Sequence, residues 1–356
     1  MHQSRMLARP AGLMRAIACL FALPLSLAMV TASLPARAAD ASAMRPEPAA
    51  WTVLGADTKA GPTRDEGWSR NGRPALDYRY AVGKGQLSLL VLPTPGAVLA
   101  KAGGLTFSVK ASHMTNLGLS LEEQGGGRWT VPIVLNANQW QTIEIAFDDF
   151  VLSTGGDAPA DNNGKLDLDR VQRIAIVDVG AMLSSSSSDV MRLFGIEGGA
   201  RRLVIDDLMF TPPKARNSAA AAAAGAAGPA ALPSLDGFGQ PLAPWWAFGA
   251  GRIEPGASAP LTQPGLTVDY QKRTGAVMSL IRPVPVGALA GASGIDVSLA
   301  SRVKTTLVLK LEQSDGDKFE RSFDVAGTSA LQTERLSFAD FKRSDDSRSR
   351  STRPDP

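Results

Sequence analysis

Aromatic side chains on short, turn-bounded segments are the residues of this sequence best suited to binding a ligand. A sugar packs its C–H face on an aromatic ring while neighbouring polar groups hydrogen-bond its hydroxyls. Tyr78 and Tyr80 lie two positions apart, so they share one face of a strand, and Arg79 points to the other side. The aromatic candidates are Trp51, Trp68, Tyr78, Tyr80, Trp129 and Trp140.

Four of these rings are the predicted ligand-binding residues: Tyr78, Tyr80, Trp129 and Trp51. Trp129 follows a run of glycines at 125–127, which favours an exposed turn. Two interpretations stay open for Tyr78 and Tyr80, because the same spacing also suits packing in a core between two sheets. Trp140 heads a strand and is expected to belong to the core. Of Trp245 and Trp246, we expect one to pack and leave the other exposed.

Oxygen-bearing side chains gather in the segment 161–167, which reads Asp-Asn-Asn-Gly-Lys-Leu-Asp. Asp161, Asn163 and Asp167 offer the hard oxygen ligands that Ca²⁺ prefers, on a turn at Gly164. The spacing is not that of an EF-hand, and an ordinary Asn/Gly turn explains the same residues. Ca²⁺ bound at this loop and a plain Asn/Gly turn both stay open as interpretations.

The sequence pattern does not predict an enzyme. His113 is the only histidine after residue 38, and one histidine cannot form a zinc triad. No serine lies in a G-x-S-x-G turn. Asp148 and Asp149 are adjacent on a predicted strand, so their side chains point to opposite faces and cannot flank one glycosidic bond. Carboxylates distant in sequence can still meet in space.

Residues 1–38 are predicted to be a cleaved secretory signal. Three arginines precede the apolar run 16–30, and Ala36-Arg37-Ala38 forms an A-x-A cleavage site. A membrane anchor is the weaker alternative, because the run is shorter than the ~20 residues of a span. The signal contains the single cysteine and four arginines, which leaves 33 basic against 34 acidic residues and no thiol chemistry. We expect a periplasmic or extracellular protein that does not bind nucleic acid.

Period-two alternation between turn residues predicts an all-β fold of antiparallel sandwiches. A flexible segment at 39–50 is expected to precede a first sandwich at 51–211. The predicted strands are at 76–80, 105–109, 117–121, 142–147, 174–177 and 202–210. Residues 212–233, rich in Ala, Pro and Gly, read as a linker.

A second sandwich of the same type is predicted at 234–343, followed by a disordered tail at 344–356. Five stretches recur with an offset of 190 to 195 residues, among them Phe147–Phe150 as Phe338–Phe341. The second copy lacks counterparts of the strands at 174–179 and 203–210, so it is predicted to be incomplete. Either another chain completes it, or it folds poorly, or the reading frame is damaged.

Three stretches of the first copy resemble the galactose-binding-like jelly rolls, in the group of family 11 carbohydrate-binding modules and complex I intermediate-associated proteins. The stretch 140–150 fits W-x-x-h-x-h-x-F-x-D-F, where h is apolar. Residues 161–168 with the strand at 174–176, and the closing strand 203–208, follow in order. Residues 235–238, Leu-Asp-Gly-Phe, are similar to the group's acidic opening, which the first copy lacks.

The resemblance implies a jelly-roll sandwich and a structural Ca²⁺ between the opening segment and the closing strand, with Asp206 or Asp207 as ligand. Asp161, Asn163, Asp167 and Asp207 are therefore the predicted metal residues. The leading function is non-catalytic binding of a polysaccharide through a face of the sandwich. The alternative is a cell-envelope interaction or assembly module, in which a protein partner completes the second domain.

Overall fold

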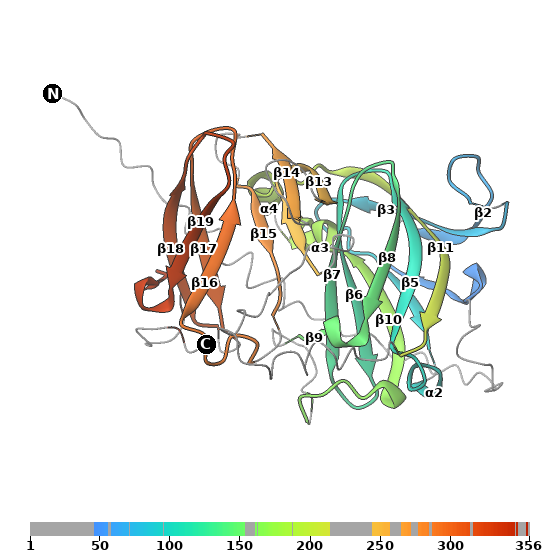
Figure 1. Ribbon diagram of the computed structural model, residues 1–356. Helices are drawn as coiled ribbons and strands as arrows, with labels where there is room; N and C mark the ends of the chain where they lie inside the picture. Colours follow the sequence, from blue (N-terminus) through green and yellow to red (C-terminus); the bar gives the residue numbers. More distant parts are fainter. Residues whose placement is uncertain are drawn as a thin grey trace.

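The computed structural model describes residues 46–55, 58–70, 72–94, 96–153, 161, 163–186, 188–213, 244–256, 265–271, 277–284, 287–313, 316–345, 347 and 354. The described chain is built from antiparallel β-sheets with a few short helices, which confirms the predicted all-β fold (Figure 1). None of the described helices is long and apolar enough to cross a bilayer. The predicted signal and most of the predicted linker lie outside the described residues, so both stay predictions.

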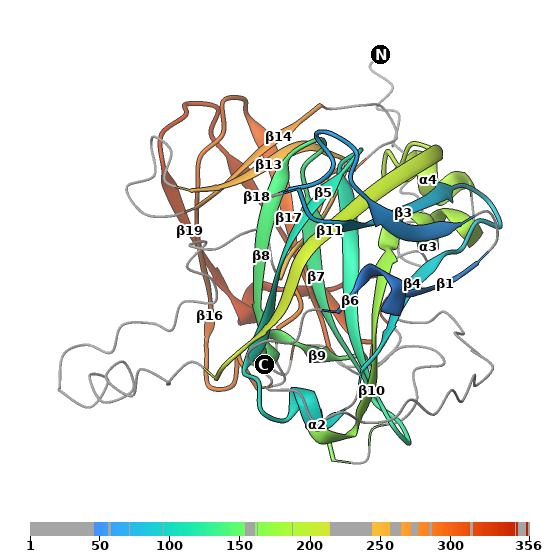
Figure 2. The same ribbon diagram turned by 90° about the vertical axis from the view of Figure 1, so that its right-hand side faces the viewer.

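Two packed sheets form the first unit, residues 46–213. The six-stranded sheet has the order β1 (Thr52–Leu54), β4 (Leu89–Pro93), β10 (Val171–Asp178), β6 (Thr115–Glu123), β7 (Arg128–Leu135) and β9 (Val151–Leu152). The five-stranded sheet has the order β2 (Lys59–Thr63), β3 (Ala75–Val82), β11 (Gly199–Thr211), β5 (Gly104–Ala111) and β8 (Trp140–Ala146). Figure 2 shows β11 crossing this five-stranded sheet between β3 and β5.

The core lies between these two sheets because each strand alternates apolar and polar residues. Leu105, Phe107 and Val109 of β5 are buried in the core, whereas Ser108 and Lys110 take the other face. Ile143 and Ile145 of β8 repeat the pattern. The period of two therefore assigns one face of the five-stranded sheet to the core and leaves the other polar.

Short helices close one end of the sandwich after β10. α3 (Val179–Ser186) and α4 (Ser188–Leu193) follow the buried Asp178, while α2 (Gly96–Leu99) lies after β4. Asp178 accepts hydrogen bonds from the Tyr80 hydroxyl, at 2.7 Å, and from the backbone N–H of Ala181, at 3.2 Å. These bonds tie β3, β10 and α3 together inside the core.

Four short strands after residue 245 pack against the first unit. β12 (Trp246–Phe248) pairs with β15 (Ser279–Ile281), and β13 (Ala250–Gly256) pairs with β14 (Gly265–Tyr270). Trp246 and Phe248 share an apolar cluster with α3 residues and with Phe194, which follows α4. Trp246 also donates its indole N–H to the carbonyl of Leu117, at 2.9 Å. These residues thus cover part of the six-stranded sheet and the helices.

Residues 294–343 form a small unit with its own core around Phe319, Leu336, Phe338 and Phe341. β16 (Gly294–Leu299) pairs with β19 (Gln332–Ser337). β17 (Thr305–Glu312) pairs with β18 (Lys318–Val325), which also pairs with β20 (Lys342–Arg343). The domain boundaries expected from the sequence stay predictions.

The strand pairings of the first unit recur in order after residue 245. β1·β4, β2·β3, β5·β8, β6·β7 and β7·β9 correspond to β12·β15, β13·β14, β16·β19, β17·β18 and β18·β20. The Phe147 and Phe150 rings lie 6.2 Å apart, and those of Phe338 and Phe341 lie 6.1 Å apart. β10 and β11, the central strands of the two sheets, have no counterpart among the described residues.

Replacing Tyr80 by phenylalanine is expected to destabilise the first unit. The substitution keeps the buried ring but takes away the hydroxyl that bonds Asp178, so a buried carboxyl group loses one of its donors. The loss should be about 1–3 kcal/mol of unfolding free energy, measured by urea denaturation. Tyr270→Phe, on a residue that is 38% exposed, is the matched control and should change nothing. Equal stability of Tyr80→Phe and wild type would contradict the role of this bond.

Candidate functional site

The candidate site is the solvent side of the five-stranded sheet, which we call the outer face. Cross-strand register places Asp77 of β3, Val204 of β11, Lys110 of β5 and Trp140 of β8 in one row. Arg79 and Arg202 are cross-strand partners two positions along. Each of these residues alternates with a core residue on its own strand, so the row faces away from the core.

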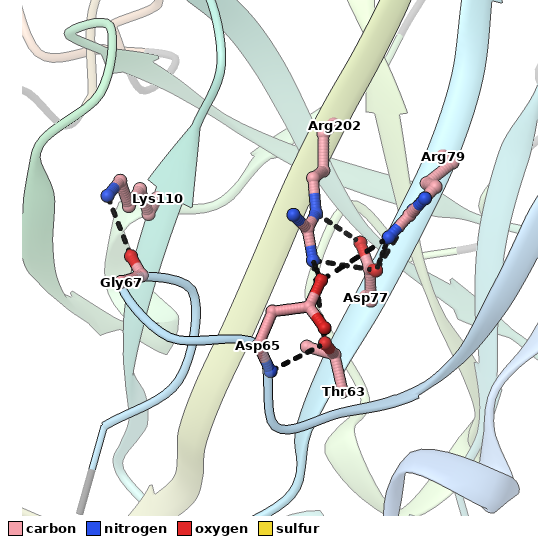
Figure 3. Close-up of polar contacts among 7 residues, drawn as sticks. All are labelled: Thr63, Asp65, Gly67, Asp77, Arg79, Lys110 and Arg202. Atoms are coloured by element: carbon pink, nitrogen blue, oxygen red, sulfur yellow. Dashed lines mark hydrogen bonds and ion pairs between the residues drawn. The ribbon is translucent and has the colours of Figure 1, made fainter.

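An ion-pair network fixes the polar groups of the outer face (Figure 3). Asp77 accepts from Nε of Arg202 at 2.9 Å and from Nη2 of Arg79 at 2.8 Å. Asp65 pairs with Arg202 at 2.5 Å and with Arg79 at 3.6 Å. The hydrogen bond from Arg202 lowers the pKa of Asp65, so this carboxylate is ionised at neutral pH. Asp77 is nearly buried and Arg202 only 19% exposed, which makes this more than a surface pair.

The β2–β3 loop lies over the outer face and brings Trp68 to it. Lys110 donates to the carbonyl of Gly67 at 2.8 Å (Figure 3). Its Nζ lies 4.8 Å from the centroid of the Trp68 ring, and the Arg202 guanidinium lies 4.4 Å from the same ring. Two cations from two strands thus hold a half-buried indole against the face by cation–π attraction.

A second indole, that of Trp140, lies at the far edge of the same row. Its ring is half-buried, and the guanidinium of Arg70 lies 5.7 Å from its centroid. Arg70 also donates to the Ser108 hydroxyl at 2.5 Å, which anchors the β2–β3 loop to β5. Trp140 therefore belongs to the outer face, whereas the sequence analysis expected it in the core.

Tyr78 and Tyr80 do not lie on the outer face, which corrects the prediction that they bind the ligand. They are 1% and 4% exposed and stack on each other with ring centroids 4.7 Å apart. Their hydroxyls bond Ser88 and Asp178, so both polar tips are satisfied inside the core. The alternative interpretation, core packing, is therefore the one that holds for Tyr78 and Tyr80. The face of β3 that carries them is turned toward the second sheet.

Trp51 and Trp129 are also buried, at 8% and 7% exposure, so neither offers a ring face to a sugar. Trp129 pairs with Leu121 of β6 and Leu152 of β9, and it packs in the core although a glycine turn precedes it. The period-two pattern of the sequence could have identified the outer face. The residues of this face are the polar neighbours of the core residues on each strand.

The residues of the predicted calcium loop lie close together, and hydrogen bonds within the loop hold them there. Asp161 accepts from the backbone N–H groups of Asn163 and Gly164, and Asn163 donates to Asp167 at 3.0 Å. Within the described residues, no three His, Cys, Asp or Glu side chains form a group able to hold a metal. This arrangement fits the Asn/Gly turn of the alternative interpretation, and calcium at this loop stays a prediction.

Glu123, the last residue of β6, lies beside this loop and was not among the residues predicted from the sequence. Its side chain is 3% exposed, and Oε2 has no hydrogen-bond partner among the described residues. A Cβ on residue 127 would lie 3.0 Å from this oxygen and 3.2 Å from Oδ1 of Asp161, so Gly127 leaves room between two carboxylates. Burial raises the pKa of Glu123, and the nearby Asp161 and Asp167 raise it further.

Asp207 lies apart from this loop, next to Asp206 on β11. Asp207 pairs with Arg73 at 3.4 Å, and its backbone N–H donates to Asp206 at 2.8 Å. Asp207 has a φ of 53°, which accompanies a register shift between β11 and β5. Burial raises the pKa of Asp206, and the Asp207 carboxylate adds to this effect. Among the described residues, no group of three His, Cys, Asp or Glu side chains lies around Asp207 either, and calcium there stays a prediction.

Comparisons with known proteins find solved structures of low similarity and no matching family. No protein-family model matches the chain, and no curated protein is significantly similar to it. A family 11 carbohydrate-binding module from Clostridium thermocellum, solved with a β-1,3-1,4-mixed-linked tetrasaccharide, is 17% identical with a TM-score of 0.33. The match covers 46% of this chain and 91% of that one.

Two further solved structures are similar at the same level. TmCBM61, in complex with β-1,4-galactotriose, is 15% identical with a TM-score of 0.28, over 47% of this chain and 90% of that one. An exo-β-agarase is 15% identical with a TM-score of 0.32, over 49% of this chain and 24% of that one. Such identities concern the fold, and residue roles have to come from this chain itself.

Replacing Glu123 by glutamine is expected to stabilise the protein at neutral pH. Since the folded state holds the Glu123 proton more tightly than the unfolded chain, ionisation lowers stability as the pH rises through the folded-state pKa. The glutamine removes this cost, and its amide can donate to Asp161. Urea unfolding at pH 8 should show a gain on the order of 1 kcal/mol. The gain should vanish at about pH 3, below the usual glutamate pKa.

The same pair of proteins tests the predicted ion. If Ca²⁺ raises the melting temperature of the wild type and does not raise that of Glu123→Gln, the ion binds at Glu123 and the loop. An equal gain for the variant at both pH values, with no response to Ca²⁺ or to chelator in either protein, would contradict both the titration of Glu123 and the metal prediction.

Proposed function

We propose that this protein is an exported, non-catalytic carbohydrate-binding protein and that the outer face holds a polysaccharide. One observation carries the proposal: Trp68 and Trp140 lie half-buried on one polar sheet face, and Lys110 connects them. Lys110 is the cross-strand neighbour of Trp140, and its ammonium group lies 4.8 Å from the Trp68 ring. Two indoles with hydrogen-bonding groups between them are what a run of sugar residues requires.

The polar groups of the outer face support the proposal because they are held in place before any ligand arrives. Arg79 and Arg202 each bond Asp77 through Nε and one terminal nitrogen. The remaining terminal nitrogen of each has no hydrogen-bond partner among the described residues. A ligand hydroxyl or carbonyl would meet donors whose conformational entropy is already lost, which favours binding.

The β2–β3 loop sets the shape of this surface. Val204, in the middle of the row, is fully buried although it faces away from the core. Side chains therefore cover the centre of the face, and the accessible groups lie around it. A chain of sugars would run over the two indoles rather than lie flat on the strands, so the ligand is expected to contact the loop as well as the sheet.

Replacing Trp68 or Trp140 by alanine is expected to abolish most of the binding. Each indole should contribute about 1–3 kcal/mol, which corresponds to a loss of affinity of roughly 5-fold to 150-fold. Isothermal titration calorimetry of the full chain against soluble β-glucans, galactans, mannans and uronans is the measurement. Tyr270→Ala removes an exposed aromatic residue outside the first unit and should leave affinity unchanged.

Two results would contradict glycan binding at this face. One is wild-type protein that binds no polysaccharide of the panel. The other is binding that survives in the Trp68→Ala, Trp140→Ala double variant. Circular dichroism and the unfolding midpoint of each variant show whether the sandwich is intact, so a loss of binding is attributed to the indoles only when the fold is kept.

A second candidate function, that of a protein-interaction module, is favoured by the broken sheets after residue 245. β10 joins β4 to β6 in the first unit, and β11 joins β3 to β5. The corresponding strands β15 and β17, and β14 and β16, have no strand between them among the described residues. Leu309 and Leu311 are accordingly half-buried, whereas their counterparts Leu119 and Leu121 are 2% and 0% exposed.

These gaps would accept two strands from a partner polypeptide by β-augmentation. We expect that a chain in which a copy of residues 163–211 is appended after residue 343 fills them. Hydrogen exchange of the β17 amides should then slow on the order of tenfold or more. An appended segment of the same composition in scrambled order is the control. Unchanged exchange in both chains would remove this candidate.

A further inference from the structure

A shallow depression beside the outer face is lined by positive side chains. Its volume is about 650 Å³. Lys59, Arg79, His113, Arg201 and Arg202 line it together with Ser112. No aspartate or glutamate is among the described residues that line it. Three of these residues, Lys59, Arg79 and Arg202, are cross-strand neighbours on the outer side of the sheet. Permanent cations beside one open hollow attract an anion, and a neutral sugar does not need them.

Two of these cations are oriented by the network already described. Arg79 and Arg202 oppose Asp65 and Asp77, so this group of four is neutral in sum. The carboxylates hold the guanidinium planes in position without entering the depression. Planar guanidinium groups bind carboxylate and sulfate oxygens through paired N–H donors, so the two free terminal nitrogens are suited to an oxyanion.

The excess positive charge on the outer side comes from Lys59. Lys59 is exposed on the edge strand β2 opposite Arg79, and it has no ion-pair partner among the described residues. Arg201, the cross-strand partner of Tyr80, alternates with Arg202 and turns to the inner side of the sheet, where it is 8% exposed and donates to the carbonyl of Glu197. The buried Asp178 is the carboxyl group that faces it from the core, and burial raises the pKa of Asp178, which weakens its compensation of Arg201.

His113 completes the lining without adding charge at neutral pH. Burial lowers its pKa, and the nearby Arg201 lowers it further. Its Nδ1 lies 2.8 Å from the Ser112 hydroxyl, which in turn accepts the backbone N–H of Arg202 at 3.0 Å. The depression therefore combines fixed cations with neutral hydrogen-bonding groups of defined position.

We propose that this depression binds the oxyanion of an acidic polysaccharide, a carboxylate or sulfate substituent on a sugar held at Trp68. The inference rests on the proposed function that the outer face binds a glycan. Arg202 connects the two places, because it lines the depression and lies 4.4 Å from the Trp68 ring. A sugar residue stacked on Trp68 would thus lie next to Arg202, which also lines the depression.

Matched polymers test the inference on the full chain. Calorimetry compares polygalacturonate with its fully methyl-esterified form, and dextran sulfate with dextran, so the backbone stays while the charge changes. We expect at least one acidic polymer to bind about tenfold more tightly than its neutral partner at an ionic strength of about 0.05 M. The preference should shrink at about 0.5 M, where screening is strong. A preference for polygalacturonate would identify a carboxylate as the ligand, and a preference for dextran sulfate would identify a sulfate.

Lys59 locates the effect, because its exposed position on β2 lets it be replaced with little change in stability. Lys59→Ala should weaken binding of the acidic polymer about threefold and Lys59→Glu about tenfold, with no change for neutral polymers. Lys101→Ala is the control: this exposed lysine follows α2, which Figure 1 shows at the other end of the sandwich from β2, and its loss should have no effect.

The outcomes separate this inference from the proposed function. Equal affinity for the acidic and neutral member of both pairs, with binding still lost on Trp68→Ala, would overturn the anion site and leave glycan binding intact. A charge preference reduced as much by Lys101→Ala as by Lys59→Ala would also overturn it, since the attraction would then be diffuse. Absence of binding to every polymer would remove both proposals at once.

Discussion

The side-chain alternation of β3 is the constraint on which the rest of the first unit depends. Tyr78 and Tyr80 face the core, where Ser88 and Asp178 satisfy their hydroxyls, and Asp77 and Arg79 face the solvent. A shift of one residue would bury a charged pair and expose two tyrosines, so the register is strongly specified. Because β3 is set in this way, Asp77 meets Arg202 on β11, and the β2–β3 loop is drawn onto the sheet through Asp65 and Trp68.

Much of the fold was predictable from this period of two, and the site was predictable only in part. The alternation located the strands around Tyr78, Phe107 and Ile205 and the order of turns between them. It could not say which face of β3 would meet the second sheet, because both tyrosine and a charged residue tolerate a half-buried position. Trp68 was among the aromatic candidates, but its position on the outer face was not predictable, because it lies in a loop and the cations of two distant strands hold it there.

The part of the chain after residue 245 shows how far strand order alone specifies structure. Local hairpins such as β17–β18 form there in the same order as in the first unit, since their contacts are short-range. Joining these small sheets into two larger ones needs the central strands, and these have no counterpart among the described residues. The apolar side chains of β17 are consequently left half-covered, which no count of hydrophobic residues would have revealed.

Two asparagine side chains of the first unit each bond both the N–H and the carbonyl of one backbone residue after residue 245, as a neighbouring strand would. Asn116 exchanges hydrogen bonds of 2.7 Å with both backbone groups of Ala247, and Asn136 does the same with Ile253 at 2.6 and 3.1 Å. A protease cut between residues 213 and 244 would therefore leave the fragments associated. A recombinant protein that ends at residue 213 would instead expose Val134 and the cluster around Met182, and its poor solubility would be an artefact of the boundary.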